Sequence, residues 1–238
     1  MTSFYQNSHN IAIYDKITKK RGCAMVKAII FDMDGVLFDT EPYYFERRKR
    51  FLDSQDISIS HMSPKDFIGG NLQQVWHQLL GEHFQAAQVQ AISDDYEEFK
   101  KNNPVPYTEL LFPKIKETLQ QLTEKNIKLA LASNSSPSDV QRAIASCQLK
   151  DYFDYVLTAK DVDNPKPAPD IYLKVGHLLG LPKNEVWVIE DSQKGISAAK
   201  EAGYQVYGTK DYRYGIDQDQ ADHIIDNISE LISLITDK

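Results

Sequence analysis

Two aspartates separated by one residue, Asp32 and Asp34, follow directly on a short apolar run at residues 28–31. Two carboxylates placed this close at the end of a buried strand repel each other and lose hydration unless a cation or a shared proton compensates. Gly35 comes next and allows the backbone to turn sharply away. The pattern predicts a metal-binding or proton-transfer site. The alternative is a solvated acidic turn, since Asp and Gly are common turn residues.

A second acidic pair, Glu190 and Asp191, follows the apolar run at residues 186–189. If both runs are parallel strands of one sheet, their carboxyl ends meet at the edge where open α/β sheets bind ligands. Carboxylate oxygens with no His or Cys nearby are the donors that Mg²⁺ prefers. We therefore expect Mg²⁺ as the cofactor.

Two further segments offer groups suited to an anion. Ser133 and Asn134 follow the run at residues 129–132, where hydroxyls and backbone N–H groups at a helix start form a natural phosphate site. The same residues would also serve as a plain helix cap. Lys166 lies between two prolines that fix the backbone around it, so it is either a rigidly aimed cation or part of a stiff surface loop.

The elements that must position these residues are short apolar runs alternating with helical patterns. The runs are continuous, as expected for parallel strands buried on both faces, and cover residues 28–31, 129–132, 155–157, 186–189, 206–207 and 224–225. Ser136, Pro137 and Asp139 form a helix-start pattern, and Gly203 lies where a helix ends. The alternation predicts an α/β fold, a doubly wound (Rossmann-like) parallel sheet with right-handed crossovers.

Residues 41–103 carry helical patterns and no strand pattern, which predicts an all-helical cap domain inserted after the first strand. We expect a catalytic core over residues 25–40 and 107–238, a cap over residues 41–106, and a dispensable, weakly ordered extension over residues 1–24. Within the cap, the basic run at residues 47–50 is interpreted as a solvated helix face, the alternative being recognition of an anionic substrate. Gly69, Gly70 and Asn71 are either a plain turn or a segment that contacts the substrate's leaving group.

Bulk composition restricts the partners. A net charge of −7 argues against nucleic-acid binding, which needs clustered Lys and Arg, but leaves room for a small phosphorylated substrate. No apolar run approaches the roughly 20 residues that span a bilayer, and the N-terminus has no signal-peptide pattern. We expect a cytoplasmic monomer with no membrane or nucleic-acid partner.

The four polar segments, in this order, resemble the motifs of the haloacid dehalogenase superfamily. They cover residues 32–36, 133–135, 166–170 and 190–192, and the resemblance extends from residue 25 to the C-terminus. The helical segment is similar to the cap of the β-phosphoglucomutase-like phosphatase branch. The resemblance implies an attacking Asp32 that forms an aspartyl-phosphate and an Asp34 that acts as general acid and base. It also implies a Mg²⁺ site made of the Asp32, Asp191 and Glu190 carboxylates and the Asp34 backbone carbonyl. The phosphoryl oxygens would be bound by Ser133, Asn134 and Lys166.

The resemblance is compatible with two enzyme activities, a phosphatase and a phosphosugar mutase. Mutases of this type look to carry a histidine where this chain has Tyr43 and Tyr44, and a basic residue just after the second motif, where residues 135–138 carry no charge. We therefore expect a phosphatase acting on a small phosphorylated metabolite, a sugar phosphate or similar. A β-phosphoglucomutase-like phosphosugar mutase is the alternative. A receiver-type signalling module, the non-enzymatic reading, is disfavoured by the chain's size, its cap and its Asp-x-Asp spacing.

Overall fold

A single parallel sheet forms the centre of the computed structural model, which describes residues 25–68, 72–80 and 84–236. Its strand order is β3-β2-β1-β4-β5-β6. The strands are β1 (Ala28–Phe31), β2 (Lys128–Ser133), β3 (Tyr155–Thr158), β4 (Val186–Glu190), β5 (Gln205–Thr209) and β6 (His223–Ile225). The chain builds outward from β1 to β3 and then returns to place β4 beside β1, so the strand order reverses there. The predicted doubly wound sheet is confirmed.

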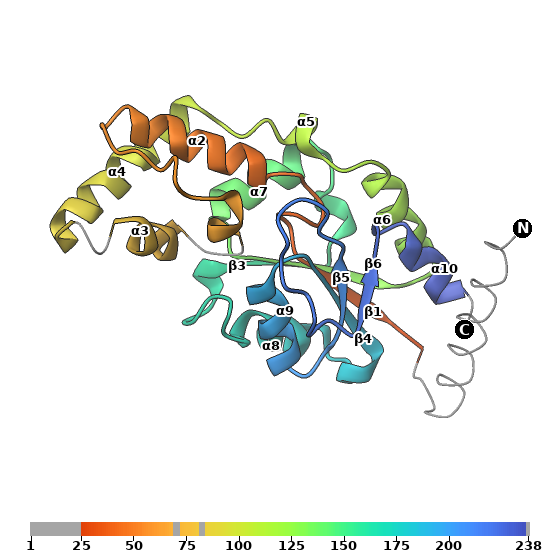
Figure 1. Ribbon diagram of the computed structural model, residues 1–238. Helices are drawn as coiled ribbons and strands as arrows, with labels where there is room; N and C mark the ends of the chain where they lie inside the picture. The colour runs from red at the N-terminus through yellow and green to blue at the C-terminus, as the bar shows by residue number, and fades with distance from the viewer. Residues whose placement is uncertain (1–24, 69–71, 81–83, 237–238) are drawn as a thin grey trace, which may run out of the picture.

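Helices cover both faces of the sheet, which explains the continuous apolar strands. Ile29 and Phe31 of β1 face one apolar cluster, whereas Ala28 and Ile30 face the other. Helices α6 (Ile115–Glu124), α7 (Pro137–Ser146) and α10 (Glu230–Thr236) lie on the first face, and α8 (Asp170–Leu179) and α9 (Gln193–Glu201) on the second (Figure 1). Short 3₁₀ turns complete the connections at Lys150–Tyr152, Ala159–Asp161 and Lys183–Glu185.

The predicted helix ends are confirmed. Ser136 precedes α7, and its hydroxyl accepts a hydrogen bond from the Asp139 backbone N–H at 3.2 Å, with Pro137 in the first turn. Gly203 follows α9 with a φ of +83°, a left-handed conformation that glycine adopts without strain.

The described part of the segment at residues 41–106 contains helices and no strand. It contains α2 (Glu41–Asp53), a 3₁₀ turn (Pro64–Phe67), α3 (Leu72–Leu80) and α4 (Ala86–Asn102), followed by the short α5 (Tyr107–Leu110). Helices α2, α3 and α4 stand at one end of the molecule (Figure 1) and bury an apolar cluster of their own that includes Phe51, Trp76 and Tyr96. This separate cluster favours the predicted cap, whose boundaries stay a prediction. Residues 1–24 and 69–71 lie outside the described residues.

No helix in the described ranges is long and apolar enough to cross a membrane.

Candidate active site

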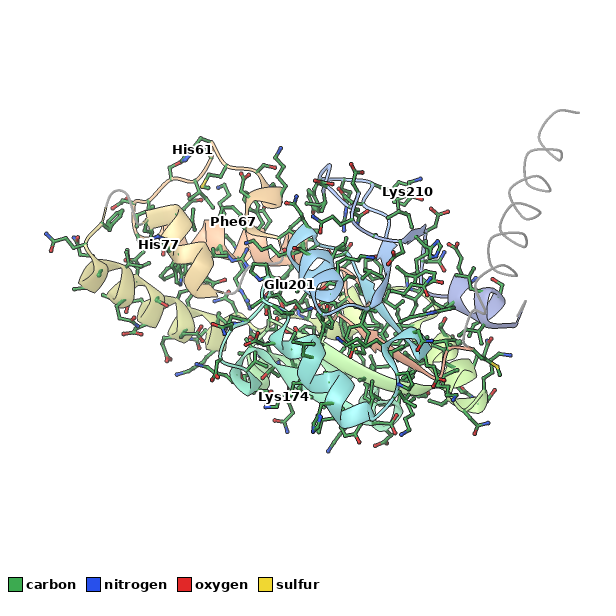
Figure 2. The ribbon with its side chains drawn as sticks, turned by 90° about the horizontal axis from the view of Figure 1, so that it is seen from below. His61, Phe67, His77, Lys174, Glu201 and Lys210 are labelled. Carbon is green, nitrogen blue, oxygen red and sulfur yellow. The ribbon has the colours of Figure 1, made fainter. Side chains whose placement is uncertain are left out.

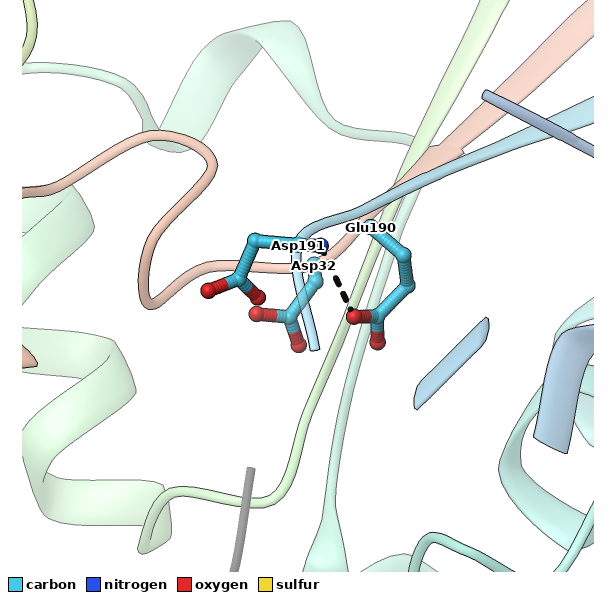
Figure 3. Close-up of side chains that lie close together, drawn as sticks. All are labelled: Asp32, Glu190 and Asp191. Carbon is cyan, nitrogen blue, oxygen red and sulfur yellow. Dashed lines mark hydrogen bonds between the residues drawn. The ribbon is translucent and has the colours of Figure 1, made fainter. Parts of the chain in front are cut away.

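Three carboxylates meet at the carboxyl edge of the sheet. Asp32 follows β1 and Glu190 ends β4, two strands paired through Phe31 and Ile189, and Asp191 comes next in the chain. One oxygen from each carboxylate lies within 4.8 Å of the others (Figure 3). Asp32 and Glu190 are buried, and Asp191 is partly exposed. The structure thus brings together the two acidic pairs singled out in the sequence.

Gly35 makes room for this cluster. Its φ is +77°, and a Cβ placed on it would lie 2.0 Å from Oδ2 of Asp191. Any other residue there would strain the turn and displace the Asp191 carboxylate. The glycine after the Asp-x-Asp pair is therefore needed for close approach as well as for the turn.

Lys166 is the buried cation of the cluster. Its Nζ donates to Oδ1 of Asp32 at 2.5 Å, to Oε1 of Glu190 at 2.6 Å and to the Ala132 carbonyl at 2.9 Å. Burial lowers the pKa of the Lys166 ammonium, but the charges of the two carboxylates outweigh burial and raise that pKa. Lys166 is therefore held as a cation, and the stiff surface loop is ruled out.

One ammonium does not neutralise three carboxylates. Burial, followed by the charges of Glu190 and Asp32, raises the pKa of Asp191 well above its usual range. A divalent cation would remove this repulsion, and the donors are all hard oxygens. The residues present therefore fit a Mg²⁺ ion held by Asp32, Asp191 and a neighbouring carbonyl.

Glu190 is fixed from several sides. The Tyr172 hydroxyl donates to its Oε1 at 2.7 Å, and the Ser192 hydroxyl donates to its Oε2 at 3.2 Å. A Cβ on Gly195 would lie 1.8 Å from Oε1, so α9 approaches the carboxylate closely. Sequence reasoning did not assign roles to Tyr172, Ser192 or Gly195. The available signal was the hydroxyl of Tyr172 on the otherwise apolar buried face of α8.

Asp34 stands apart from the acidic cluster. Its Oδ1 accepts a hydrogen bond from the Thr40 hydroxyl and its Oδ2 from the Ser135 hydroxyl, each at 2.6 Å. Burial raises the pKa of Asp34, and hydrogen bonds from Ser135, Thr40 and Tyr44 oppose that rise. A carboxyl with a raised pKa, oriented by two hydroxyls, is suited to proton transfer. The contribution of Thr40 was missed because the sequence gives no distance between it and Asp34.

Ser133 is the last residue of β2, the strand beside β1, and Asn134 follows it. The Ser133 hydroxyl accepts a hydrogen bond from the Ser135 backbone N–H at 3.0 Å. The Asn134 amide bonds both the N–H and the carbonyl of Lys166 at 3.1 Å, which joins the second and third motifs. The phosphate contacts predicted for Ser133 and Asn134 stay predictions. Gly69, Gly70 and Asn71, for which a contact with the substrate's leaving group was the alternative to a plain turn, lie outside the described residues.

A cavity extends from these groups toward the cap. Asp32, Asp34 and Lys166 line it from the core, and α2 and α4 line it from the other side. Glu41, the first residue of α2, also lines it, and burial raises the pKa of its carboxyl to about 7. The interpretation of the basic run as a solvated face is wrong for Arg47 and Arg48, which are buried because α2 packs on α4 and over the cavity.

Comparison with known proteins identifies the class. Residues 29–209 match the family model described as haloacid dehalogenase-like hydrolase. The phosphorylated carbohydrates phosphatase of Thermotoga maritima is 35% identical over 190 residues, which cover 77% of this chain and 85% of that protein. The β-phosphoglucomutase of Bacillus subtilis is 29% identical over 191 residues, covering 77% of this chain and 83% of that protein. The crystal structure of a β-phosphoglucomutase from Clostridium difficile superposes with a TM-score of 0.75 at 22% identity, covering 90% and 96% of the two chains.

The chain therefore belongs to the haloacid dehalogenase-like hydrolase family. Within it, the chain falls in the β-phosphoglucomutase-like branch and is a phosphoric monoester hydrolase acting on a phosphorylated substrate.

Proposed function

We propose that this enzyme is a Mg²⁺-dependent phosphatase that hydrolyses a small phosphorylated metabolite, a sugar phosphate or similar, through an aspartyl-phosphate on Asp32. The carrying observation is the separation of two carboxylates. Asp32 lies in the acidic cluster and accepts a hydrogen bond from Lys166. Asp34 lies outside that cluster and accepts hydrogen bonds from the hydroxyls of Thr40 and Ser135. The name of the Thermotoga maritima relative supports a phosphorylated carbohydrate as the substrate class.

Asp32 supplies the nucleophile. Lys166 bonds one oxygen of the Asp32 carboxylate, which orients the group, and the other oxygen attacks the phosphorus in line with the leaving oxygen. The bond between phosphorus and the leaving oxygen breaks as the new bond to Asp32 forms. Water then attacks the aspartyl-phosphate, releases inorganic phosphate and restores the Asp32 carboxylate.

Asp34 moves the protons. In the first step its carboxyl donates a proton to the leaving oxygen, and in the second its carboxylate takes a proton from the attacking water. Burial favours the protonated carboxyl needed first, while Thr40 and Ser135 stabilise the carboxylate needed afterwards. The opposing effects suit a group that must hold and release a proton within one cycle.

The remaining charges stabilise the transferring phosphoryl group. Mg²⁺, bound by Asp32, Asp191 and the Asp34 carbonyl with Glu190 contributing directly or through water, would supply positive charge to the phosphoryl oxygens. Lys166 adds a second positive charge, and Ser133 and Asn134 offer hydrogen-bond donors to the same oxygens. The cap, residues 41–106, covers the cavity, excludes water and selects the substrate.

A screen of phosphorylated metabolites tests the proposal. Inorganic phosphate should be released with Mg²⁺ and not with excess EDTA, and sugar phosphates should rank among the preferred substrates. Phosphate release that is unaffected by EDTA would contradict the metal's role. A product that keeps its phosphate at a new position would instead reveal the mutase, which the Bacillus subtilis relative keeps as the second candidate.

A further inference from the structure

Arg48 of α2 is a buried cation in the wall of the active-site cavity. Its side chain is 8% exposed and lines the same cavity as Asp32 and Asp34. The guanidinium carbon lies 5.6 Å from the ring centroid of Tyr44 and 5.8 Å from that of Phe67, which Figure 2 labels among the cap helices. Two aromatic rings thus hold the guanidinium in place.

The guanidinium has unused hydrogen-bonding capacity. Within the described ranges, Nε and Nη1 of Arg48 are buried with no hydrogen-bond partner. The charge of Arg48 lowers the pKa of the Glu41 carboxyl in the same cavity wall, but the two side chains form no ion pair. Buried arginines are ordinarily paired, because an unpaired buried charge destabilises the fold. The neighbouring Arg47 shows the ordinary case: its Nε donates to the Tyr96 hydroxyl at 3.2 Å and its Nη1 to the Asn103 carbonyl at 3.1 Å.

Two of the three lysines that line the cavity have partners, and the third, Lys160, is exposed. Lys166 bonds Asp32 and Glu190, and Lys100 pairs with Glu97 at 3.1 Å and Asp139 at 3.3 Å. Arg48 therefore remains as a buried cation whose N–H groups are available to a molecule that enters the cavity.

We propose that Arg48 binds a second anionic group of the substrate, a carboxylate or a second phosphate, while Asp32 attacks the phosphoryl group. The inference rests on the proposed function and specifies its substrate class. Guanidinium N–H groups match the oxygens of both kinds of anion. The Tyr44 ring contacts Arg48, and both residues line the same cavity as Asp34, the group that protonates the leaving oxygen. The substrate is therefore a phosphomonoester whose leaving alcohol carries the second anion.

Paired substrates test this assignment. The carboxylate pair is 2-phosphoglycolate and ethyl phosphate, and the phosphate pair is glucose 1,6-bisphosphate and glucose 6-phosphate. The wild type should prefer the doubly anionic member of at least one pair, and the preferred pair tells which anion Arg48 binds. Arg48→Met keeps an apolar chain between the two rings and should lower kcat/KM for that member by about 10- to 100-fold, the usual worth of a charged hydrogen bond. The singly anionic member should change by less than about 3-fold, because it makes no contact with Arg48.

Arg50→Met is the matched control, since Arg50 is an exposed arginine on the same helix. It should leave both members of each pair as in the wild type. Arg48→Lys keeps a cation without the planar guanidinium and should retain part of the preference. The melting temperature distinguishes the two roles, because replacing an arginine that stabilises the fold would lower it. Arg48→Met should melt at the same temperature as the wild type or higher, because the substitution removes an unpaired buried charge.

Three results would overturn the assignment: no preference in either pair, equal loss of both members in Arg48→Met, or a marked drop in its melting temperature. Failure of Arg48→Met to fold is the extreme case of that drop and would overturn the assignment as well. A wild type that releases phosphate from no phosphoester would instead contradict the proposed function, so the two failures are distinguishable.

Discussion

Replacing Asp34 by Asn separates proton transfer from metal binding. The Asp34 carboxyl lies outside the group of Asp32, Glu190 and Asp191 whose oxygens approach within 4.8 Å, so its loss leaves those ligands in place. The hydroxyls of Thr40 and Ser135 donate to its two oxygens, and hydroxyls can also accept a hydrogen bond, so the asparagine amide can occupy the same position. We expect the fold and the Mg²⁺ affinity to be nearly unchanged.

Turnover should fall by about 10²–10⁴, the usual contribution of a positioned proton donor. This loss corresponds to roughly 3–5 kcal/mol in the activation barrier. In the first step, a good leaving group such as an aryl oxide departs with little help from a proton, whereas a poor one such as an alkoxide depends on it. Phosphorylation of Asp34→Asn by an aryl phosphate should therefore be impaired less than phosphorylation by an alkyl phosphate.

Pre-steady-state measurement of both substrates, with Mg²⁺ titrated into each protein, checks these expectations. Asp39→Asn is a suitable control, because Asp39 lies five residues along the chain from Asp34 and pairs with Arg213. Equal loss of the phosphorylation rate for the two substrates would refute Asp34 as the acid. A large loss of Mg²⁺ affinity would show that its side chain is a metal ligand.

Three further predictions concern Glu190, Glu41 and the N-terminal extension. Tyr172→Phe removes a hydrogen bond to the buried Glu190, so it should lower the free energy of unfolding by about 1.5–3 kcal/mol and also lower kcat. Tyr212→Phe, at an exposed tyrosine, is the control and should change neither. A Tyr172→Phe protein that melts at the same temperature as the wild type would contradict this prediction. Burial raises the pKa of Glu41 from 4.5 to about 7, so the wild type is progressively destabilised as pH rises through that window. In metal-free protein, the free energy of unfolding of Glu41→Gln, measured by urea denaturation, should rise relative to that of the wild type by up to about 3 kcal/mol as pH increases from 4.5 to about 7. A difference in stability that does not change with pH would contradict the raised pKa of Glu41. A protein beginning at Met25 should keep its melting temperature within a few degrees and its turnover, and a large loss of either would give residues 1–24 a role.

Much of the fold was predictable because strands buried on both faces leave a direct trace in the sequence. All six strands were found at the predicted positions, and the structure extends β2 and β5 by polar or small end residues such as Lys128 and Gly208. The polar residues at the carboxyl edge of the sheet were predictable by the same means, since Asp32, Ser133 and Glu190 stand where apolar runs end.

Features that depend on distance were not predictable. Thr40 and Tyr172 reach Asp34 and Glu190 only through the folded turn and the packing of α8, which no spacing in the sequence reports. The buried positions of Arg47 and Arg48 were misjudged because charged residues on a helix ordinarily face water. That exception singles out Arg48 as a residue whose burial calls for a partner.

Trapping the phosphorylated enzyme tests the central claim most directly. In a single turnover with Mg²⁺, quenching followed by peptide mass spectrometry should find a phosphoryl group on Asp32. The adduct should be absent with EDTA and in Asp32→Asn, which should also lose turnover while keeping its circular dichroism spectrum. Release of phosphate by Asp32→Asn, or a phosphoryl group on another residue during productive turnover, would contradict the mechanism.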